Sequence, residues 1–184
     1  MSNKVLSQDS FNILKEKQKE LDIFIHQRNK LKMEDTFSLR KIALFVEIGE
    51  AANELESFKY WKKEKKINLE KVQEELIDCL HFFLSLANCA KINFAAYRFQ
   101  TFTSKTLDLN KFLLSLFERT KKLNLPRRKK VVNDKISKTD KNYHGWLRVF
   151  ERICWQVKFN ETKLLDIYKK KNKVNQERQK SGSY

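Results

Sequence analysis

The stretch ALFVEIGEAANELESFKYWKK, residues 43–63, carries the strongest structural signal in this chain. Glu47, Glu50 and Glu54 recur at spacings of three and four, so on a helix they share one stripe. Between them stand small and apolar residues that are typical of a buried surface. Like charges at these spacings destabilise an isolated helix by a few tenths of a kcal/mol per pair. A helix that turns carboxylates inward therefore needs a specific physical reason.

The composition is that of one soluble globular domain. The 184 residues are 41% hydrophobic and 34% charged, with three Gly and one Pro. So few turn-forming residues favour long helices over many short strands. No apolar run is long enough to span a membrane, and the N-terminus lacks the apolar segment of a secretory signal. Three cysteines without C-x-x-C spacing indicate reduced thiols, so we expect a cytoplasmic protein with no membrane partner.

The hydrophobic pattern predicts an all-α helical bundle of five to seven helices in a single domain, residues 1–184. The apolar periodicity divides the chain into segments at about 7–32, 37–65, 68–90, 94–103, 107–123, 140–157 and 161–180. The apolar side of the second segment is predicted to consist of Ile42, Phe45, Val46, Gly49 and Ala52. A basic connector at about 124–139, which holds the only Pro, is predicted to be an exposed loop.

Two carboxylate pairs at i, i+3 suggest a metal site. Glu47 and Glu50 form the first pair, and Glu75 and Asp78 form the second. If the two helices pack antiparallel, four carboxylates converge, and they cannot all stay ionised without a cation. Mg²⁺ prefers such oxygen ligands and commonly shares its shell with substrate phosphates. A single E-x-x-E is more often a solvated helix face; two pairs among apolar residues favour the site.

The charge distribution agrees with a polyphosphate ligand. The net charge is +16, with basic residues concentrated at 119–141 and 169–180 and acidic ones at 47–56 and 70–78. The basic segments could hold the phosphates that the metal does not contact. A di-iron site is the competing interpretation, because Asp78 and His81 have carboxylate–histidine spacing. Di-iron bundles use two such helices, and neither His26 nor His144 has a carboxylate three residues earlier, so Mg²⁺ is favoured.

Three motifs in the chain resemble the dimeric all-α dUTPase family, a branch of the MazG-like all-α nucleoside triphosphate pyrophosphatases. The first two are VEIGEAANELESFKYWKK at 46–63 and EELIDCLHFFLSLA at 74–87. The third, KNKVNQERQKSGSY at 171–184, is similar to the family's K-N-x-x-N-x-x-R-Q-x-x-G-Y, with Ser183 altering its end. The resemblance covers about 20–91 and 164–184 and is weak in between.

This resemblance implies an all-α fold with a four-helix metal-binding core, a homodimer, and Mg²⁺-dependent hydrolysis of dUTP to dUMP and pyrophosphate, which limits uracil in DNA. It implies Mg²⁺ binding by Glu47, Glu50, Glu75 and Asp78. Glu47 is expected also to orient the attacking water as a general base. The implied base-binding residues are His81 with Trp61 or Phe58, and the implied phosphate-binding residues are Lys171, Asn175 and Arg178. Candidates for the family's early uracil-reading positions are Asp22, His26, Gln27 and Asn29.

Three functions stay open on the sequence alone. The first is a dUTP diphosphatase, with dUDP as a possible second substrate. The second is a related pyrophosphohydrolase that prefers another base, because carboxylates do not select the nucleobase. The third is a basic helical nucleic-acid-binding protein with structural carboxylates; the chain shows neither an aromatic RNA-binding signature nor a helix-turn-helix in its support.

Overall fold

The computed structural model describes residues 4–103, 108–126 and 137–182, and within them the chain forms six helices and no strand. The helices are α1 Gln8–Arg28, α2 Phe37–Leu55, α3 Leu69–Cys89, α4 Leu109–Lys121, α5 Lys138–Gln156 and α6 Glu161–Ser181. The predicted all-α class is confirmed. Of the predicted basic connector, residues 127–136 lie outside the described part, and α5 begins before the connector was expected to end.

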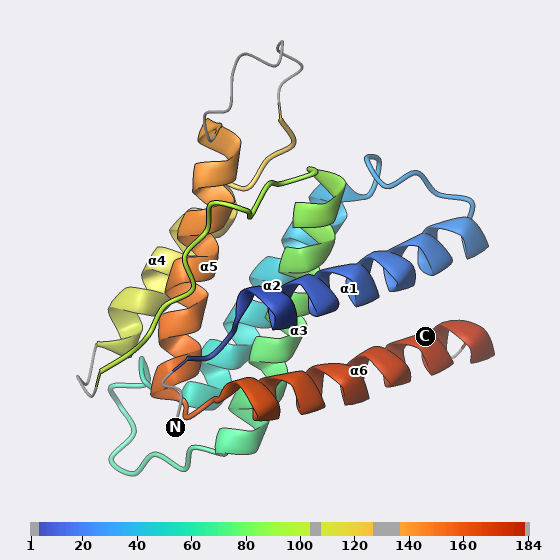
Figure 1. Cartoon of the computed structure of the whole chain (residues 1–184). Helices are drawn as coiled ribbons and strands as arrows, with labels where there is room; N and C mark the ends of the chain where they lie inside the picture. Colours follow the sequence, from blue (N-terminus) through green and yellow to red (C-terminus); the bar gives the residue numbers. More distant parts are fainter. Residues whose placement is uncertain (1–3, 104–107, 127–136, 183–184) are drawn as a thin grey trace.

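Helix α3 lies at the centre of the fold and contacts α1, α2, α5 and α6. Helices α1 and α6 lie side by side and form one layer against α3, whereas α4 and α5 pack together on the other side of the α2–α3 pair (Figure 1). Asn68 begins α3 as its N-cap, because its side chain accepts from the backbone N–H groups of Glu70 and Lys71.

Helices α2 and α3 run antiparallel, as the carboxylate argument requires. Arg40 Nη1 donates to Ser85 Oγ at 2.7 Å, near the start of α2 and the end of α3. Glu47, seven residues after Arg40 on α2, lies beside Asp78, which is seven residues before Ser85 on α3. Residue numbers therefore rise along one helix where they fall along the other. Both Arg40 and Glu47 of α2 face α3.

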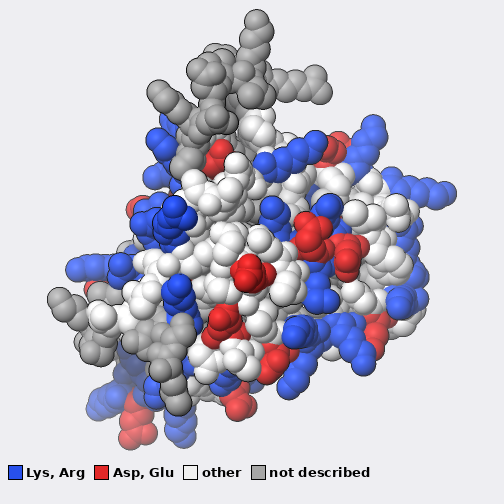
Figure 2. Space-filling model, viewed as in Figure 1, with Lys and Arg blue, Asp and Glu red and all other residues white. Residues whose placement is uncertain are grey.

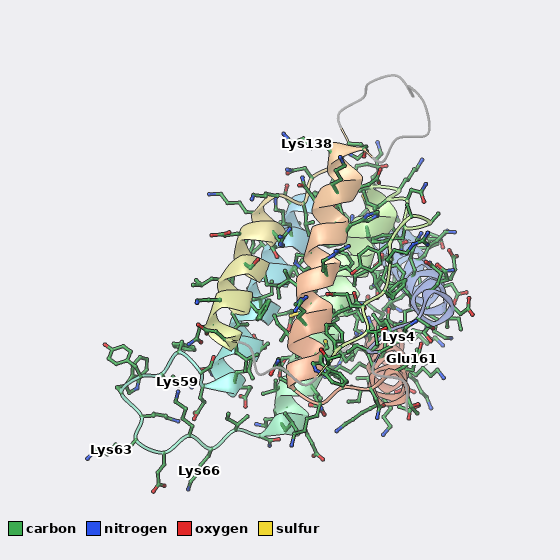
Figure 3. All side chains as sticks on the ribbon, turned by 60° about the vertical axis from the view of Figure 1, so that its left-hand side comes forward. Lys4, Lys59, Lys63, Lys66, Lys138 and Glu161 are labelled. Atoms are coloured by element: carbon green, nitrogen blue, oxygen red, sulfur yellow. The ribbon has the colours of Figure 1, made fainter. Side chains whose placement is uncertain are left out.

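Helix α2 ends at Leu55 rather than near residue 65. Glu56 takes the left-handed conformation, with φ of 52°, and ends the helix. Its carboxylate binds the Lys59 ammonium at 3.4 Å, the Lys62 ammonium, and the backbone N–H of Lys66 at 3.3 Å. These contacts fold residues 56–68 into a projecting loop that carries the labelled lysines 59, 63 and 66 (Figure 3). The prediction of a longer helix missed this carboxylate-centred turn.

Residues 94–103 contain no helix, so this aromatic segment is not one of the helices that periodicity suggested. Its Tyr97 hydroxyl donates to Glu151 Oε2 at 2.5 Å, and the Gln100 backbone N–H donates to Glu151 Oε1 at 3.2 Å. The segment is therefore held against α5 by contacts with the Glu151 side chain. Its aromatic residues are buried by tertiary packing rather than by a helical face.

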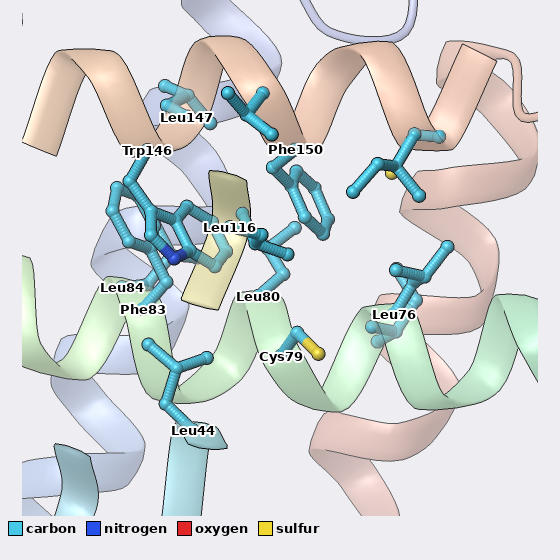
Figure 4. Close-up of a cluster of buried hydrophobic side chains, with 14 of the residues drawn as sticks. Leu44, Leu76, Cys79, Leu80, Phe83, Leu84, Leu116, Trp146, Leu147 and Phe150 are labelled. Carbon is cyan, nitrogen blue, oxygen red and sulfur yellow. The ribbon is translucent and has the colours of Figure 1, made fainter. Parts of the chain in front are cut away.

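The apolar core is centred between α3 and α5 (Figure 4). The rings of Phe83 and Trp146 stack at 4.1 Å between centroids, and Phe150 stacks on Trp146 at 5.2 Å. Trp146 Nε1 donates to Thr120 Oγ1 at 2.8 Å, which joins α4 to the same cluster. These contacts fix one face of α3 and leave the opposite face for the polar residues of the site.

The predicted apolar side of α2 is only partly buried. Ile42 and Val46 are 60% and 51% exposed. The residues that α2 does bury lie on a neighbouring stripe and include Leu44, Ile48, Ala51 and Leu55. Helix α2 thus carries two apolar stripes, one in the core and one on the surface.

Candidate active site

Three of the four predicted metal ligands lie together between α2 and α3. Each of Glu47, Glu75 and Asp78 offers a carboxylate oxygen, and these oxygens lie within 4.8 Å of one another. Glu50 lies outside this group, and its side chain is exposed. Its charge still raises the pKa of Glu47, of Glu75 and of Asp78. Glu50 is therefore a neighbour of the cluster in this structure.

The cluster holds its protons unusually tightly. Burial, together with the charges of Asp78, Glu50 and Glu75, raises the pKa of Glu47 to about 7. Burial also raises the pKa of Glu75 and that of Asp78, against the lowering effect of the Lys171 ammonium. Repulsion among close carboxylates disfavours full ionisation, and a nearby cation relieves it.

The Lys171 ammonium of α6 supplies positive charge to this cluster through an ion pair with Asp78 Oδ2. Both side chains are partly buried. The ion pair joins α6 to α3 directly beside the three carboxylates. A phosphate group placed here would meet Lys171 on the same side as the cluster.

The donor set fits a hard divalent cation. It consists of carboxylate oxygens, which suit Mg²⁺, and in the described residues no histidine joins the group. His81, the residue that suggested a di-iron site, is absent from this group. The raised pKa values agree with a site whose charge is completed by a cation.

A cavity of about 660 Å³ extends from the carboxylates between α1, α2, α3 and α6. Its size suits a nucleotide-sized ligand. At the carboxylate end it is lined by Glu47, Glu74, Asp78, Lys170, Lys171, Asn175 and Arg178. Further polar lining comes from Gln18, Asp22, His26, Thr36, Arg40, His81 and Ser85. The apolar walls are Leu21, Ile25, Leu31, Leu39, Phe82 and Val174.

The second polar group, away from the carboxylates, is organised by the Gln18 side chain. Gln18 Nε2 donates to Asp22 Oδ1 at 2.8 Å. Gln18 Oε1 accepts from His81 Nδ1 at 2.7 Å and from the Tyr168 hydroxyl at 2.9 Å. One amide therefore connects α1, α3 and α6 and holds the His81 ring, which stacks on Tyr168 at 4.0 Å.

The two polar regions lie on the same faces of α2 and α3. Arg40 and Glu47 are seven residues apart on α2, and Asp78 and Ser85 are seven apart on α3. At 1.5 Å per residue, this spacing separates the regions by about 10 Å. The cavity can therefore hold a ligand with an anionic end and a ring system some distance from it.

The structure brings most predicted substrate-binding residues to this cavity. His81, Lys171, Asn175 and Arg178 all line it. Phe58 and Trp61 do not: they lie on the loop after α2 and are 44% and 61% exposed.

Several lining residues were not predicted from the sequence. Among the early candidates, Asp22 and His26 line the cavity, whereas Gln27 and Asn29 are exposed and do not. Glu74 was overlooked beside the Glu75–Asp78 pair, although it is charged and adjacent. Gln18, Arg40 and Ser85 carry no local signal, because their roles arise only when three helices meet.

Comparison with known families assigns the chain to one group of enzymes. A family model described as dUTPase matches residues 10–184. The chain belongs to the all-α dUTPase family. The match spans almost the whole sequence, including the middle region where the motif resemblance was weak. No curated protein matches the chain.

Membership of the dUTPase family establishes the enzyme class. The chain is a nucleoside triphosphate pyrophosphohydrolase with dUTP diphosphatase activity. Family membership also implies a divalent metal ion, for which the acidic cluster is the candidate site. Among its described residues, no helix is both long and apolar enough to cross a membrane.

Proposed function

We propose that this dUTPase hydrolyses dUTP to dUMP and pyrophosphate in a Mg²⁺-dependent reaction at the cavity between α1, α2, α3 and α6. The main support is that two of the three clustered carboxylates, Glu47 and Asp78, line the same cavity as a buried polar region, with about two helical turns between them. This arrangement suits a triphosphate at one end and a base at the other. We propose a cytoplasmic location and a role in limiting uracil in DNA.

Glu47, Glu75 and Asp78 would hold the cation, and Glu50 would join them by turning its exposed side chain inward. When bound, Mg²⁺ supplies positive charge that neutralises the triphosphate. It would also lower the pKa of Glu47, which is about 7 without it. The ionised Glu47 then accepts a proton from the attacking water.

Helix α6 is proposed to bind the phosphates. Lys171, Asn175 and Arg178 stand at i, i+4 and i+7, so they share one face, and all three line the cavity. Arg178 can bind two phosphate oxygens at once through its guanidinium group. Basic residues are spread widely over the face drawn in Figure 2, and this positive field would draw the anionic substrate toward the protein. The charge therefore does not require a nucleic-acid partner.

The base is proposed to lie among the apolar walls, near His81. The neutral His81 ring is fixed by Gln18 and Tyr168, so it is held ready before the ligand binds. Burial and, to a smaller extent, the charge of Lys171 lower the pKa of His81 to about 3, so the ring stays uncharged. Phe58 and Trp61, although implied as base-binding residues, do not reach this position within one chain.

We also propose a homodimer that uses the exposed stripe of α2. Leu39, Ile42 and Val46 form this stripe on the surface of α2. Exposed apolar stripes of this kind commonly mark a protein interface. Light scattering should give a mass twice the 22.1 kDa of the chain. An active monomer would contradict the proposal.

The proposed function is tested by turnover. Purified protein with dUTP and Mg²⁺ should release pyrophosphate, and removal of the ion with a chelator should stop the release. UTP and dTTP should be much poorer substrates, and dUDP shows whether a third phosphate is needed. Failure to release pyrophosphate from dUTP at any Mg²⁺ concentration would overturn the proposal.

A further inference from the structure

The Lys171 ammonium lies within the proposed metal site. It is paired with Asp78 Oδ2, and the two side chains are 27% and 21% exposed. Its positive charge lowers the pKa of Glu47, of Glu75 and of Asp78. One ammonium group thus acts on all three clustered carboxylates. Lys171 therefore supplies part of the positive charge that a divalent cation would supply at the same place.

The negative charge of the cluster is larger than one ammonium can neutralise. Glu50 and Glu74 add to it, since the charges of both raise the pKa of Glu75 and of Asp78. Among the described residues, Lys171 is the basic residue that forms an ion pair with the cluster. The acidic partners of the other ion pairs there are Glu16, Glu56, Asp108 and Glu177. The cluster therefore keeps an unbalanced negative charge that favours a second cation.

Lys171 and a divalent cation compete for the same carboxylate. Asp78 is one of the three residues that would hold the metal, and Mg²⁺ binds carboxylate oxygens. An ammonium that is paired with one of these oxygens occupies lone pairs and repels a further cation at short range. Mg²⁺ carries twice the charge of the ammonium, so three carboxylates attract it more strongly. The ion pair is therefore expected to break when the metal binds.

Release of the ion pair requires only a movement of the Lys171 side chain. Contacts with α1 hold α6 on both sides of this residue. The Tyr168 hydroxyl is hydrogen-bonded to α1, and Arg28 Nη1 of α1 donates to the Lys180 backbone oxygen at 3.1 Å. The lysine stem is flexible, and the other proposed phosphate-binding residues line the cavity from the same face of α6. A released ammonium can therefore turn toward bound phosphates while the helix stays in place.

We propose that Lys171 is an internal counter-cation of the metal site, which pairs with Asp78 until Mg²⁺ displaces it and then binds a phosphate of the nucleotide. This exchange couples two binding events. Lys171 opposes the binding of Mg²⁺ alone, and it favours the binding of Mg²⁺ together with a nucleotide. The proposal rests on the proposed function, because it concerns the same metal and phosphate sites. It adds the way in which the two sites depend on each other.

The affinity for Mg²⁺ in the absence of nucleotide provides the first test. The Lys171→Met variant keeps an apolar stem and loses the charge. In calorimetric titration at pH 8, it should bind Mg²⁺ about ten- to a hundredfold more tightly than the wild type, the range expected for loss of one competing charge-assisted contact. The matched Lys173→Met variant, on the exposed side of α6, should bind Mg²⁺ as the wild type does. Unchanged or weaker Mg²⁺ binding in folded Lys171→Met overturns the exchange.

The reactivity of Lys171 in the wild-type protein provides a test that needs no variant. Acetic anhydride modifies the neutral form of a lysine, which an adjacent carboxylate disfavours. Peptide mass spectrometry should show that Mg²⁺ alone raises the rate of Lys171 acetylation. A non-hydrolysable dUTP analogue added with Mg²⁺ should lower this rate again, because a phosphate then holds the ammonium. Lys173 should react at one rate throughout. A Lys171 rate that does not change with Mg²⁺ overturns the exchange, whether or not the methionine variant folds.

These measurements separate the exchange from the proposed function. Wild-type protein that releases pyrophosphate from dUTP, with the same Mg²⁺ affinity as Lys171→Met, would overturn the exchange and leave the proposed function standing. Wild-type protein that does not hydrolyse dUTP would overturn the proposed function, whatever the Mg²⁺ titrations show. Tighter Mg²⁺ binding by Lys171→Met together with the rise in wild-type acetylation supports the exchange.

Discussion

Buried polar groups on the two sides of α3 differ in whether their atoms have hydrogen-bond partners. Toward α5, the buried Glu151 accepts from Tyr97 and Gln100, and Thr120 accepts from Trp146. Toward α1 and α6, Asp22 and His81 each keep one atom without a partner. This difference distinguishes polar groups that stabilise the fold from polar groups that are available to bind a ligand. Gln73 Oε1, Ser57 Oγ and Asn172 Nδ2 are exceptions, because they have no partner among the described residues although these three residues do not line the cavity.

The largest effect is expected on the ligand side, from Glu47→Gln. The variant removes a metal-binding oxygen and the proposed general base, so kcat should fall by about 10²–10⁴-fold. Steady-state release of pyrophosphate from dUTP measures it. Glu54→Gln, on the same helix but outside the carboxylate group, is the matched control and should keep near-normal activity. Full activity in Glu47→Gln would remove the assignment.

The next effect is expected on the structural side, from Glu151→Ala. The change leaves the Tyr97 hydroxyl and the Gln100 backbone N–H without their acceptor, and it should destabilise the protein by roughly 2–4 kcal/mol. Urea denaturation measures the loss, while kcat per folded molecule should change little. A large fall in kcat with unchanged stability would show that the two sides are not separated as described.

A smaller effect is expected from Arg178→Ala at the phosphate end. Loss of a charge-assisted contact should raise the KM for dUTP by about 10–100-fold, with a lesser change in kcat. Lys173→Ala removes a charge from the exposed side of the same helix and serves as the control. Equal effects of the two variants would mean that only the overall positive field matters, not the contact.

The smallest effect concerns pH. The pKa of Glu47 is about 7 without a cation, and a metal ligand must lose its proton. Mg²⁺ affinity should therefore fall by up to about tenfold per pH unit below 7 and level off above it. Calorimetric titration at pH 6 and pH 8, in two buffers of different ionisation enthalpy, gives both the affinity and the proton release. Equal affinity without proton release would contradict the raised pKa.

Local spacing made part of the site predictable. Helical spacing pointed to the carboxylates Glu47, Glu75 and Asp78. The resemblance of the C-terminal motif to the dUTPase family pointed to Lys171, Asn175 and Arg178. The antiparallel pairing of α2 and α3 was a condition of the metal-site argument, and the structure meets it.

The parts that were missed depend on tertiary contacts. Asp22 was one of several candidates until Gln18 and His81 were seen to surround it. The end of α2 at Leu55 depends on the lysines that gather around the Glu56 carboxylate. The irregular course of residues 94–103 depends on Glu151, more than forty positions later in the chain.

The seven-residue spacings on α2 and α3 fix both the distance and the relative direction of the two polar regions of the cavity. Seven residues are nearly two complete turns, so Arg40 and Glu47 stay on one side of α2. Insertion of one residue between Arg40 and Glu47 would rotate one side chain by about 100° around the helix axis and shift it by about 1.5 Å relative to the other. The number of residues in this part of α2 is therefore as tightly constrained as the identity of its two end residues, although Ile42 and Val46 between them face outward.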